Sequence, residues 1–411
     1  MSAPLAIAAV RSATGIDGYG VFPSKIGEVV ASSSEIGKYT DSRLTQYRVS
    51  PNVSAADWGQ TTQFVINPGI SSKIIHAMLD VTVSNTSATD TVTPKYAGYL
   101  ADNIQLCIDG SAAPTMQISA DALQLQFERL SPTRIAGLVA GNAYGMTSQF
   151  ALGAAIPVSS TVTYTIKLDT FICKVPPKLL GAPITMNVNW AQNPVDTGDG
   201  TLRLVSSVLK LHVLTDPATD LALSRQVSSY PLLLSYATPD YYTYNIILTA
   251  GQAVTQPLPG LRGAYTAMVL MIRAAQVGVA GAGYRTFTAL DVAAETNSLI
   301  DLQTSTGISL LGSGAISGRT SRYTIPSMHT SGGLQSQVNP MYWLMASPTP
   351  GEDLSPDSDS VNGIYNLDGT SQLQLTPSPA SGLGGAYILT IVAYRQSCLS
   401  LSSSGVLRAL Y

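Results

Sequence analysis

Three histidines are the residues best suited to metal binding or acid–base chemistry, but their spacing does not bring them together. His76, His212 and His329 are far apart, and none stands at metal-ligand spacing from another histidine or from a cysteine. His76 and His212 fall in alternating apolar and polar runs, where we expect them to be structural residues of strands. His329 lies in the run IPSMHTSGG, which predicts a solvated loop. The histidines therefore indicate no catalytic or metal site.

The cysteines are also far apart and odd in number. Cys107, Cys173 and Cys398 lie in the apolar or strand-like runs IQLCID, DTFICKV and RQSCLSL, where buried free thiols are expected. The opening MSAPLAIAAVRS has no basic segment and too short an apolar run for a secretory signal peptide. No run approaches the roughly 18 apolar residues that a membrane span needs. We therefore expect three unpaired cysteines and folding in a reducing cytoplasm.

The one acidic cluster, GEDLSPDSDSVNG at 351–363, loosely resembles a calcium loop. Asp357, Asp359 and Asn362 offer oxygen ligands, but the Gly comes one position late and the distal Glu is missing, which favours an exposed acidic loop. The run GISLLG lacks the second Gly of the nucleophile motif G-x-S-x-G. The Gly-rich run GVAGAG is not followed by a helix and predicts a flexible loop. We expect no catalytic, cofactor-binding or metal-binding residue, and no enzyme activity.

The composition is typical of a protein whose surface contacts other protein. Only 11% of the residues are charged, against about 25% in an ordinary globular protein. The hydrophobic content is 45%, which excludes a disordered chain. Hydroxyl and amide side chains carry most of the polarity, and large contacts cost less when few charges must be desolvated. The net charge of −3 argues against direct binding of nucleic acid, whose affinity for proteins depends on Lys and Arg.

The elements that must position these residues are mainly strands, because most apolar residues recur with a period of two. One run, SADALQLQFERLS at 119–131, instead predicts a short helix with Ser119 as its N-cap. Long Gly-, Ser- and Pro-rich stretches at 276–296, 312–340 and 348–364 predict loops. The expected strands are 61–67, 72–85, 103–110, 160–175, 184–190, 201–215, 241–248, 264–275, 298–305, 341–347, 371–377 and 386–399.

Two domains are expected, and their strand patterns repeat. The run DPATDLALSRQ at 216–226 predicts a linker, and the Gly- and Ser-rich start predicts an arm. We expect the arm at 1–45, a first domain at 46–220 and a second domain at 221–411. Many short strands separated by turn residues are typical of sandwiches and barrels. The two-halved pattern favours an all-β fold of two consecutive eight-stranded jelly rolls, with a short helix and long loops.

The run AYILTIVAYRQSCL at 386–399 predicts where the late strand sits. Its two alternating sets of side chains are both largely apolar, as expected for a strand that is covered on both faces. In a jelly roll the last strand returns to lie beside an early one, inside a sheet. We therefore expect 386–399 to be a central strand of the second jelly roll.

Several of these runs resemble one protein family. TTQFVINPGISSKIIHAMLDVTVSNTSATDTVT, followed by NIQLCIDG, resembles the first strands of double jelly-roll major capsid proteins of tectivirus-like, membrane-containing icosahedral viruses. The carboxyl end from Gly363 to Tyr411 is similar to the closing strands of that lineage, with a Gly-x-x-Asn-hydrophobic motif and a terminal aromatic. The sequence departs from the pattern at Asp368-Gly369 and around Ser397. The matching residues are Gly363, Asn366, Leu367, Leu399, Gly405, Leu407 and Tyr411.

The resemblance covers about 60–411 and implies a function in virus assembly. It implies a major capsid protein that forms homotrimeric, pseudo-hexagonal capsomers, which tile an icosahedral shell around an internal membrane. The implied partners are the protein itself, penton and minor capsid proteins, and the internal viral membrane at the amino-terminal arm, with no direct contact to nucleic acid. The implied location is the virion, after folding in the host cytoplasm.

Other classes of protein also fit an all-β chain of this length. A trimeric, β-rich viral spike or receptor-binding protein would be present in few copies per virion. A glycosidase on a β-sandwich would need paired carboxylates, and a carbohydrate-binding module would be monomeric and would bind sugar.

Overall fold

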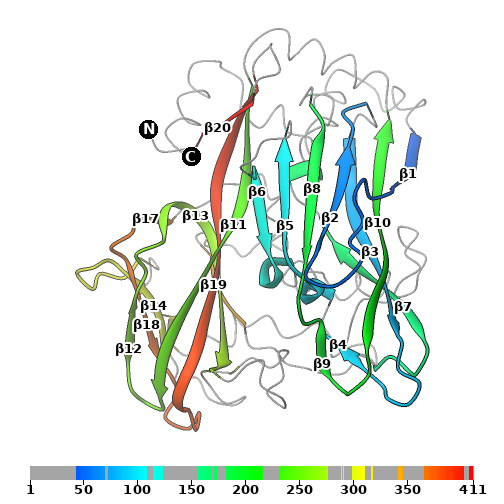
Figure 1. The fold of residues 1–411 in the computed structure, drawn as a ribbon. Helices are drawn as coiled ribbons and strands as arrows, with labels where there is room; N and C mark the ends of the chain where they lie inside the picture. Colours follow the sequence, from blue (N-terminus) through cyan, green and yellow to red (C-terminus); the bar gives the residue numbers. More distant parts are fainter. Residues whose placement is uncertain are drawn as a thin grey trace.

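The structure is a computed structural model of the 411-residue chain, shown in Figure 1. Within the residues that it describes, the regular structure is almost entirely strand, and none of the helices is long and apolar enough to cross a bilayer. The described residues are 43–69, 73–95, 97–108, 114–123, 155–168, 171–173, 182–215, 232–275, 288, 290, 299–310, 316–317, 341–345, 365–401 and 407–410.

The first half of the chain forms a sandwich of two four-stranded sheets. One sheet has the order β1-β10-β3-β7, and the other has the order β2-β8-β5-β6. A two-stranded ribbon of β4 and β9 and the short 3₁₀ turns η3 and η5 complete it. The bounds are β1 Arg43–Val49, β2 Thr61–Ile66, β3 Lys73–Asn85, β4 Thr93–Pro94, η3 Ala97–Leu100, β5 Ala101–Ile108, β6 Met116–Ser119, β7 Thr161–Lys167, η5 Phe171–Cys173, β8 Ile184–Trp190, β9 Val195–Thr197 and β10 Leu202–Thr215.

The second half forms another sandwich, which lies beside the first (Figure 1). Its sheets have the orders β11-β19-β13-β16 and β12-β18-β14-β15, while β17 also pairs with β13 and β20 with β19. The bounds are β11 Leu232–Thr249, β12 Val254–Pro257, β13 Arg262–Ala274, β14 Leu299–Gln303, β15 Ile316–Ser317, β16 Met341–Met345, β17 Tyr365–Asp368, β18 Gln372–Thr376, β19 Gly384–Leu401 and β20 Leu407–Leu410.

The two sandwiches share one topology. If the eight principal strands of each are counted in chain order, leaving out β4, β9, β17 and β20, both have the sheet orders 1-8-3-6 and 2-7-4-5. All the pairings are antiparallel, and strands far apart in the chain lie side by side, as in a jelly roll. The predicted fold of two consecutive jelly rolls is confirmed.

Alternation of apolar and polar side chains builds the first core. In β8 every second side chain is buried, and these face the apolar side chains of β3 and β10. The buried Trp190 indole donates a hydrogen bond to Thr62 Oγ1 at 2.8 Å. Trp58 packs edge-on against Trp190 with ring centroids 6.1 Å apart, and its own indole donates to the Leu202 carbonyl at 2.9 Å. The indole N–H groups of both tryptophans are therefore hydrogen-bonded.

Strand β19 is the central strand of the larger sheet of the second jelly roll. It pairs with β11 on one side and with β13 on the other. Leu389, Ile391 and Ala393 point into the core of the second jelly roll, whereas Val392 and Tyr394 belong to the hydrophobic cluster of the first. The prediction of a central strand is confirmed, and the strand is covered on both faces from Leu389 to Tyr394.

The expected strand at 160–175 is wrong in its second half. Strand β7 ends at Lys167, and the 3₁₀ turn Phe171–Cys173 follows. Ile172 in this turn is fully buried in the first core. The apolar residues that indicated a continued strand are buried by a turn that covers the core, because periodicity alone does not separate these two forms of burial.

The first strand of the second jelly roll begins earlier than predicted. The sequence pattern places it at 241–248, whereas β11 begins at Leu232. Pro239 lies within it, and a proline is tolerated there because β11 is at the edge of its sheet. The pattern also missed β1, which has seven residues, and a group of strands of two to four residues: β4, β6, β9, β12, β15, β17 and β20.

The predicted helix is described only at its start. The backbone N–H of Ala122 donates to Ser119 Oγ at 3.4 Å, as expected for an N-cap, and the helical turn continues to Leu123. Residues 124–131 lie outside the described part of the chain, as do 1–42 and the linker region 216–231. The domain limits at 45/46 and 220/221 stay predictions, although β1 already begins at Arg43.

Candidate functional site

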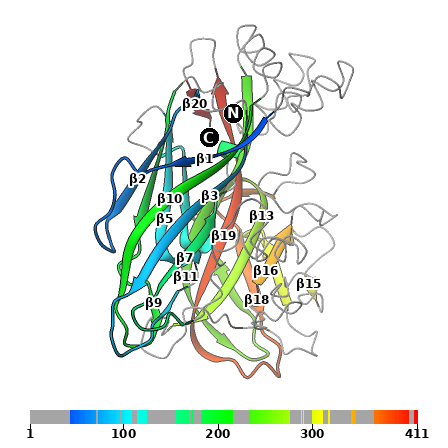
Figure 2. The same ribbon diagram turned by 90° about the vertical axis from the view of Figure 1, so that its right-hand side faces the viewer.

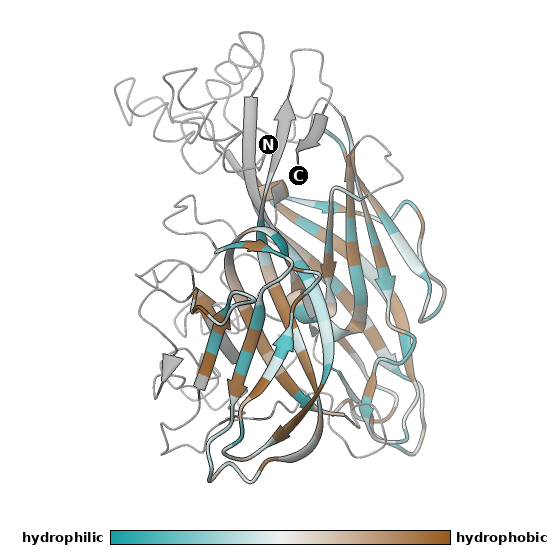
Figure 3. Cartoon of the chain, turned by 90° about the vertical axis from the view of Figure 1, so that its left-hand side faces the viewer, coloured by the Kyte–Doolittle hydropathy of each residue, from teal (hydrophilic) through white to brown (hydrophobic). Residues whose placement is uncertain are grey.

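The two jelly rolls meet at an apolar junction, which we define by five side chains on the outer face of the sheet β11-β19-β13-β16. All five are buried and belong to the same hydrophobic cluster as the first core. Figure 2 shows this sheet beside the first sandwich, and Figure 3 shows hydrophobic positions recurring along the strands of both. The junction residues are Ala267, Val269 and Met271 of β13, and Val392 and Tyr394 of β19.

A buried ion pair connects the two jelly rolls beside this junction. Arg273 of β13 places Nη2 2.5 Å from Asp121 Oδ1 and 2.6 Å from the Tyr99 hydroxyl. The Tyr99 hydroxyl donates to Asp121 Oδ1 at 2.7 Å, and the Arg273 guanidinium carbon lies 5.5 Å from the Tyr99 ring centroid. Arg273 belongs to the second jelly roll, and Asp121 and Tyr99 belong to the first. All three residues are buried, so this contact fixes the relative position of the two jelly rolls.

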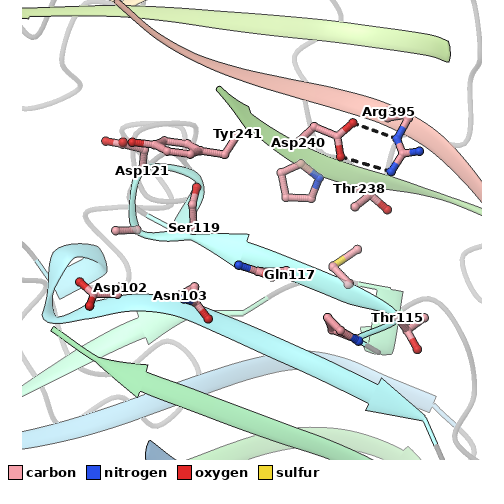
Figure 4. Close-up of a pocket in the computed structure, with 14 residues that line it drawn as sticks. Asp102, Asn103, Thr115, Gln117, Ser119, Asp121, Thr238, Asp240, Tyr241 and Arg395 are labelled. Carbon is pink, nitrogen blue, oxygen red and sulfur yellow. Dashed lines mark hydrogen bonds and ion pairs between the residues drawn. The ribbon is translucent and has the colours of Figure 1, made fainter. Parts of the chain in front are cut away.

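A second ion pair lies nearby on the second jelly roll. Asp240 of β11 accepts from Arg395 of β19, with Arg395 Nε 2.9 Å from Oδ2 and Nη2 3.3 Å from Oδ1 (Figure 4). The Tyr265 hydroxyl also donates to Asp240 Oδ2 at 3.3 Å. Burial raises the pKa of Asp240, and the attraction of Arg395 opposes the rise. Burial, followed by the nearby Asp240 charge, raises the pKa of the Tyr265 phenol.

A polar cleft of about 620 Å³ lies between β6 of the first jelly roll and β11 of the second. Figure 4 shows Asp102, Asp121 and Asp240 on its walls. The carboxylates of Asp121 and Asp240 are each held by an arginine. Burial raises the pKa of Asp102, against the effect of Lys95. The lining also includes Asn103, Pro114, Thr115, Met116, Gln117, Ser119, Ala120, Thr238, Pro239, Tyr241 and Arg395.

This arrangement suits a structural role of two of the three cleft carboxylates, Asp121 and Asp240. A glycosidase needs one carboxylate to act on the sugar and a second to donate or accept a proton. Asp121 and Asp240 are engaged in the contacts that hold the strands together, as described above. Among the described residues, no three His, Cys, Asp or Glu side chains are grouped so that they could hold a metal ion.

The structure brings together two histidines that the sequence places 136 positions apart. His76 of β3 and His212 of β10 are cross-strand partners, with ring centroids 6.5 Å apart and ring planes at 71°. Gln46 Nε2 lies 3.4 Å from His212 Nε2. Only the strand register reveals this pair, so the sequence pattern missed it. His329 and the acidic run 351–363 lie outside the described residues.

The face that carries His76 and His212 also contains a buried ion pair that the sequence did not indicate. Lys210 Nζ contacts Asp80 Oδ2, and the Thr165 hydroxyl donates to Asp80 Oδ1 at 2.7 Å. These three residues come from β10, β3 and β7, which are neighbours in one sheet. Their spacing along the chain carries no signal of this contact.

The cysteines agree with the prediction as far as they are described. Cys107 and Cys173 are both buried and neither forms a disulfide bond, and burial raises the pKa of the Cys107 thiol. The side chain of Cys398 lies outside the described part of the structure. Buried cysteines without a disulfide bond are confirmed for two of the three positions.

Comparison with solved structures identifies the fold. No protein-family model and no curated protein matches the sequence. The Faustovirus major capsid protein matches with a TM-score of 0.57 and 12% identity over 88% of this chain and 90% of that one. The mavirus major capsid protein matches with a TM-score of 0.46 and 11% identity over 92% of this chain and 91% of that one. A chain in the atomic structure of Sulfolobus Turreted Icosahedral Virus matches with a TM-score of 0.48 and 9% identity over 86% of this chain and 90% of that one.

The conclusion about the fold rests on the match to the Faustovirus protein. The match extends over nearly the whole of both chains, so it includes both jelly rolls. This chain therefore has the double jelly-roll fold of that major capsid protein.

Proposed function

We propose that this chain is the major capsid protein of an icosahedral virus and that it forms homotrimeric, pseudo-hexagonal capsomers. The observation that carries the proposal is the pair of jelly rolls with identical strand order, packed into one body through an apolar junction. The Faustovirus major capsid protein, which shares this fold over almost its whole length, supports the same function.

The arrangement of the two jelly rolls suits a capsomer. Two similar blocks in one chain give six blocks in a trimer, and six similar blocks around one axis approximate a hexagon. Hexagonal units tile a closed shell when other proteins occupy its vertices. Obligate interfaces of this kind bury upward of roughly 2,000 Å². A chain with only 11% charged residues loses little hydration free energy when it buries that much surface.

The proposal also includes the partners and the location. The capsomer contacts neighbouring capsomers, with penton and minor capsid proteins at the vertices and between the blocks. The amino-terminal arm contacts an internal viral membrane, and the net charge of −3 favours no direct contact with nucleic acid. The protein resides in the virion capsid after folding in the host cytoplasm.

Mass measurement and negative-stain imaging of the purified full chain test this function. We expect particles with the mass of three 43.0 kDa chains and a hexagonal outline. A monodisperse monomer at micromolar concentration, with no larger assembly, would contradict the proposal. Gel densitometry of purified virions distinguishes a spike protein, because a spike is present in few copies whereas a major capsid protein is the most abundant chain.

A further inference from the structure

Strand β11 presents a strip of exposed side chains on one face. From Tyr241 onward its side chains alternate strictly, and every second one points away from the core of the second jelly roll and is exposed. None of these side chains is charged. Ile247, which is 69% exposed, is the most exposed of the large hydrophobic residues described. We define the β11 strip as Tyr241, Thr243, Asn245, Ile247 and Thr249.

The equivalent strand of the first jelly roll has a different edge. Strand β1 also begins its sandwich and also lies at the edge of its sheet, but it has seven residues, two of which are the arginines Arg43 and Arg48. Short, charged edge strands resist pairing with other chains. In β11 the only such features are Pro239 and the Asp240 ion pair, and both lie before the strip. The sequence YYTYNIILT that contains the strip has neither a charge nor a proline.

The β11 strip is continuous with the junction of the two jelly rolls. Tyr241 is the cross-strand neighbour of Val392, which is buried in the junction, and Tyr241 also lines the polar cleft. Along β19 the neighbouring outer side chains then become progressively more accessible, from the buried Thr390 through the half-buried Ile388 to the exposed Ala386. The surface that packs against the first jelly roll therefore extends past it onto β11 without a change to charged side chains.

We propose that the β11 strip is a contact surface for a second copy of this chain. The proposal rests on the proposed function, because a capsid protein must bury surface against other copies of itself. The strip offers an apolar centre at Ile247 with hydroxyl and amide groups around it, which is the composition of a protein–protein contact with an apolar core and a polar rim. Contact through an exposed sheet edge also brings backbone groups of β11 into reach of the neighbour.

The substitution Ile247→Asp tests the proposal, with Ile308→Asp as the matched control. Ile308 is an isoleucine of similar exposure, 65%, in the turn after β14. The readout is the concentration at which half of the full-length chains are oligomeric, measured by mass photometry. If the wild type stays assembled at the lowest concentration, the readout becomes the urea concentration that dissociates the oligomer. We expect Ile247→Asp to weaken association at least about tenfold and Ile308→Asp to leave it unchanged.

Circular dichroism melting shows whether each variant is folded. If Ile247→Asp does not fold, Thr243→Lys places a charge on the same strip at an exposed hydroxyl and carries the test instead. Equal association of wild type and strip variants would overturn the contact proposal, as would equal weakening by Ile308→Asp. In both cases an oligomeric wild type leaves the proposed function standing. A wild type that is monomeric at every concentration would overturn the proposed function and the contact together.

Discussion

The sheet β1-β10-β3-β7 of the first jelly roll and the equivalent sheet β11-β19-β13-β16 of the second have the same strand order but different outer faces. In the first jelly roll this face holds the Asp80–Lys210 ion pair and the His76–His212 pair. In the second jelly roll this face holds the apolar junction, whose buried side chains include Val269. The inward faces are alike, because both are mainly aliphatic and alternate with a period of two. The comparison teaches that the inward pattern determines the topology, whereas the outward pattern determines what each sheet contacts.

Removal of 386–411 tests whether β19 is as central as its pairing indicates. The deletion removes the strand that joins β11 to β13 and opens two hydrophobic clusters, so the cost should exceed the roughly 5–15 kcal/mol that stabilise a domain. We expect no soluble folded protein in expression trials. Deletion of only 407–411, which removes the short β20, is the control and should leave a folded chain. A soluble product of the long deletion with an unchanged melting temperature would contradict the prediction.

A charge placed on each outer face should lower the free energy of unfolding by very different amounts in the two sheets. Val269→Asp puts an unpaired carboxylate into the buried junction and should destabilise the chain by about 5 kcal/mol. Thr82→Asp changes the half-buried outer face of β3, where the hydroxyl bonds to Thr163, and should cost about 1 kcal/mol. Urea denaturation measures both. Similar costs for the two variants would show that the faces do not differ in the way described.

The two buried ion pairs should respond differently to the loss of their cations. Arg273→Met leaves Asp121 buried without its countercharge and should cost about 3 kcal/mol, since removal of one partner is the expensive change. It should also split the calorimetric transition, because the pair joins the two jelly rolls. Lys210→Met has a comparable cost but breaks a contact within one sheet, so one transition should remain. A split transition in the Lys210 variant alone would reverse this assignment.

The smallest expected effect is the pH dependence due to Asp240. Burial raises the pKa of its carboxyl in the folded chain above the ordinary value of 3.8, so the folded state binds this proton more tightly than the unfolded state. Its contribution to stability is present below pH 3.8 and is lost as the pH rises through the raised pKa. The stability of the wild type relative to Asp240→Asn should therefore decline across that window. Denaturation of both chains at several pH values measures it, and a constant difference would contradict the prediction.

The sequence predicted well the strands in which apolar and polar residues alternate, since this alternation is a local property of the chain. The expected strand at 184–190 coincides with β8, and the expected strand at 61–67 differs from β2 by one residue. Strand β1 was missed because its residues, RLTQYRV, show no clear alternation of apolar and polar types.

The candidate site could not be predicted in the same way. Arg273 and Asp121 are 152 positions apart, and only the packing of one jelly roll on the other brings them together. The His76–His212 contact depends on the register of β3 and β10, which a one-residue slip would abolish. Residue types predicted that no metal or catalytic motif is encoded, and this stays a prediction. They did not predict which polar residues hold the two jelly rolls together.

The pairing of β11 with β19 has a consequence for synthesis on the ribosome. Strand β11 ends at Thr249, whereas its partner begins at Gly384, so residues 250–383 are translated between them. At about 5–20 residues per second, this interval lasts roughly 7–27 s. During that time the nascent chain carries β11 without its neighbour, next to other nascent chains on the same messenger RNA. The uncharged half of β11 is then the segment on which premature strand pairing between nascent chains is most favourable, and chaperone binding there would protect the yield of folded protein.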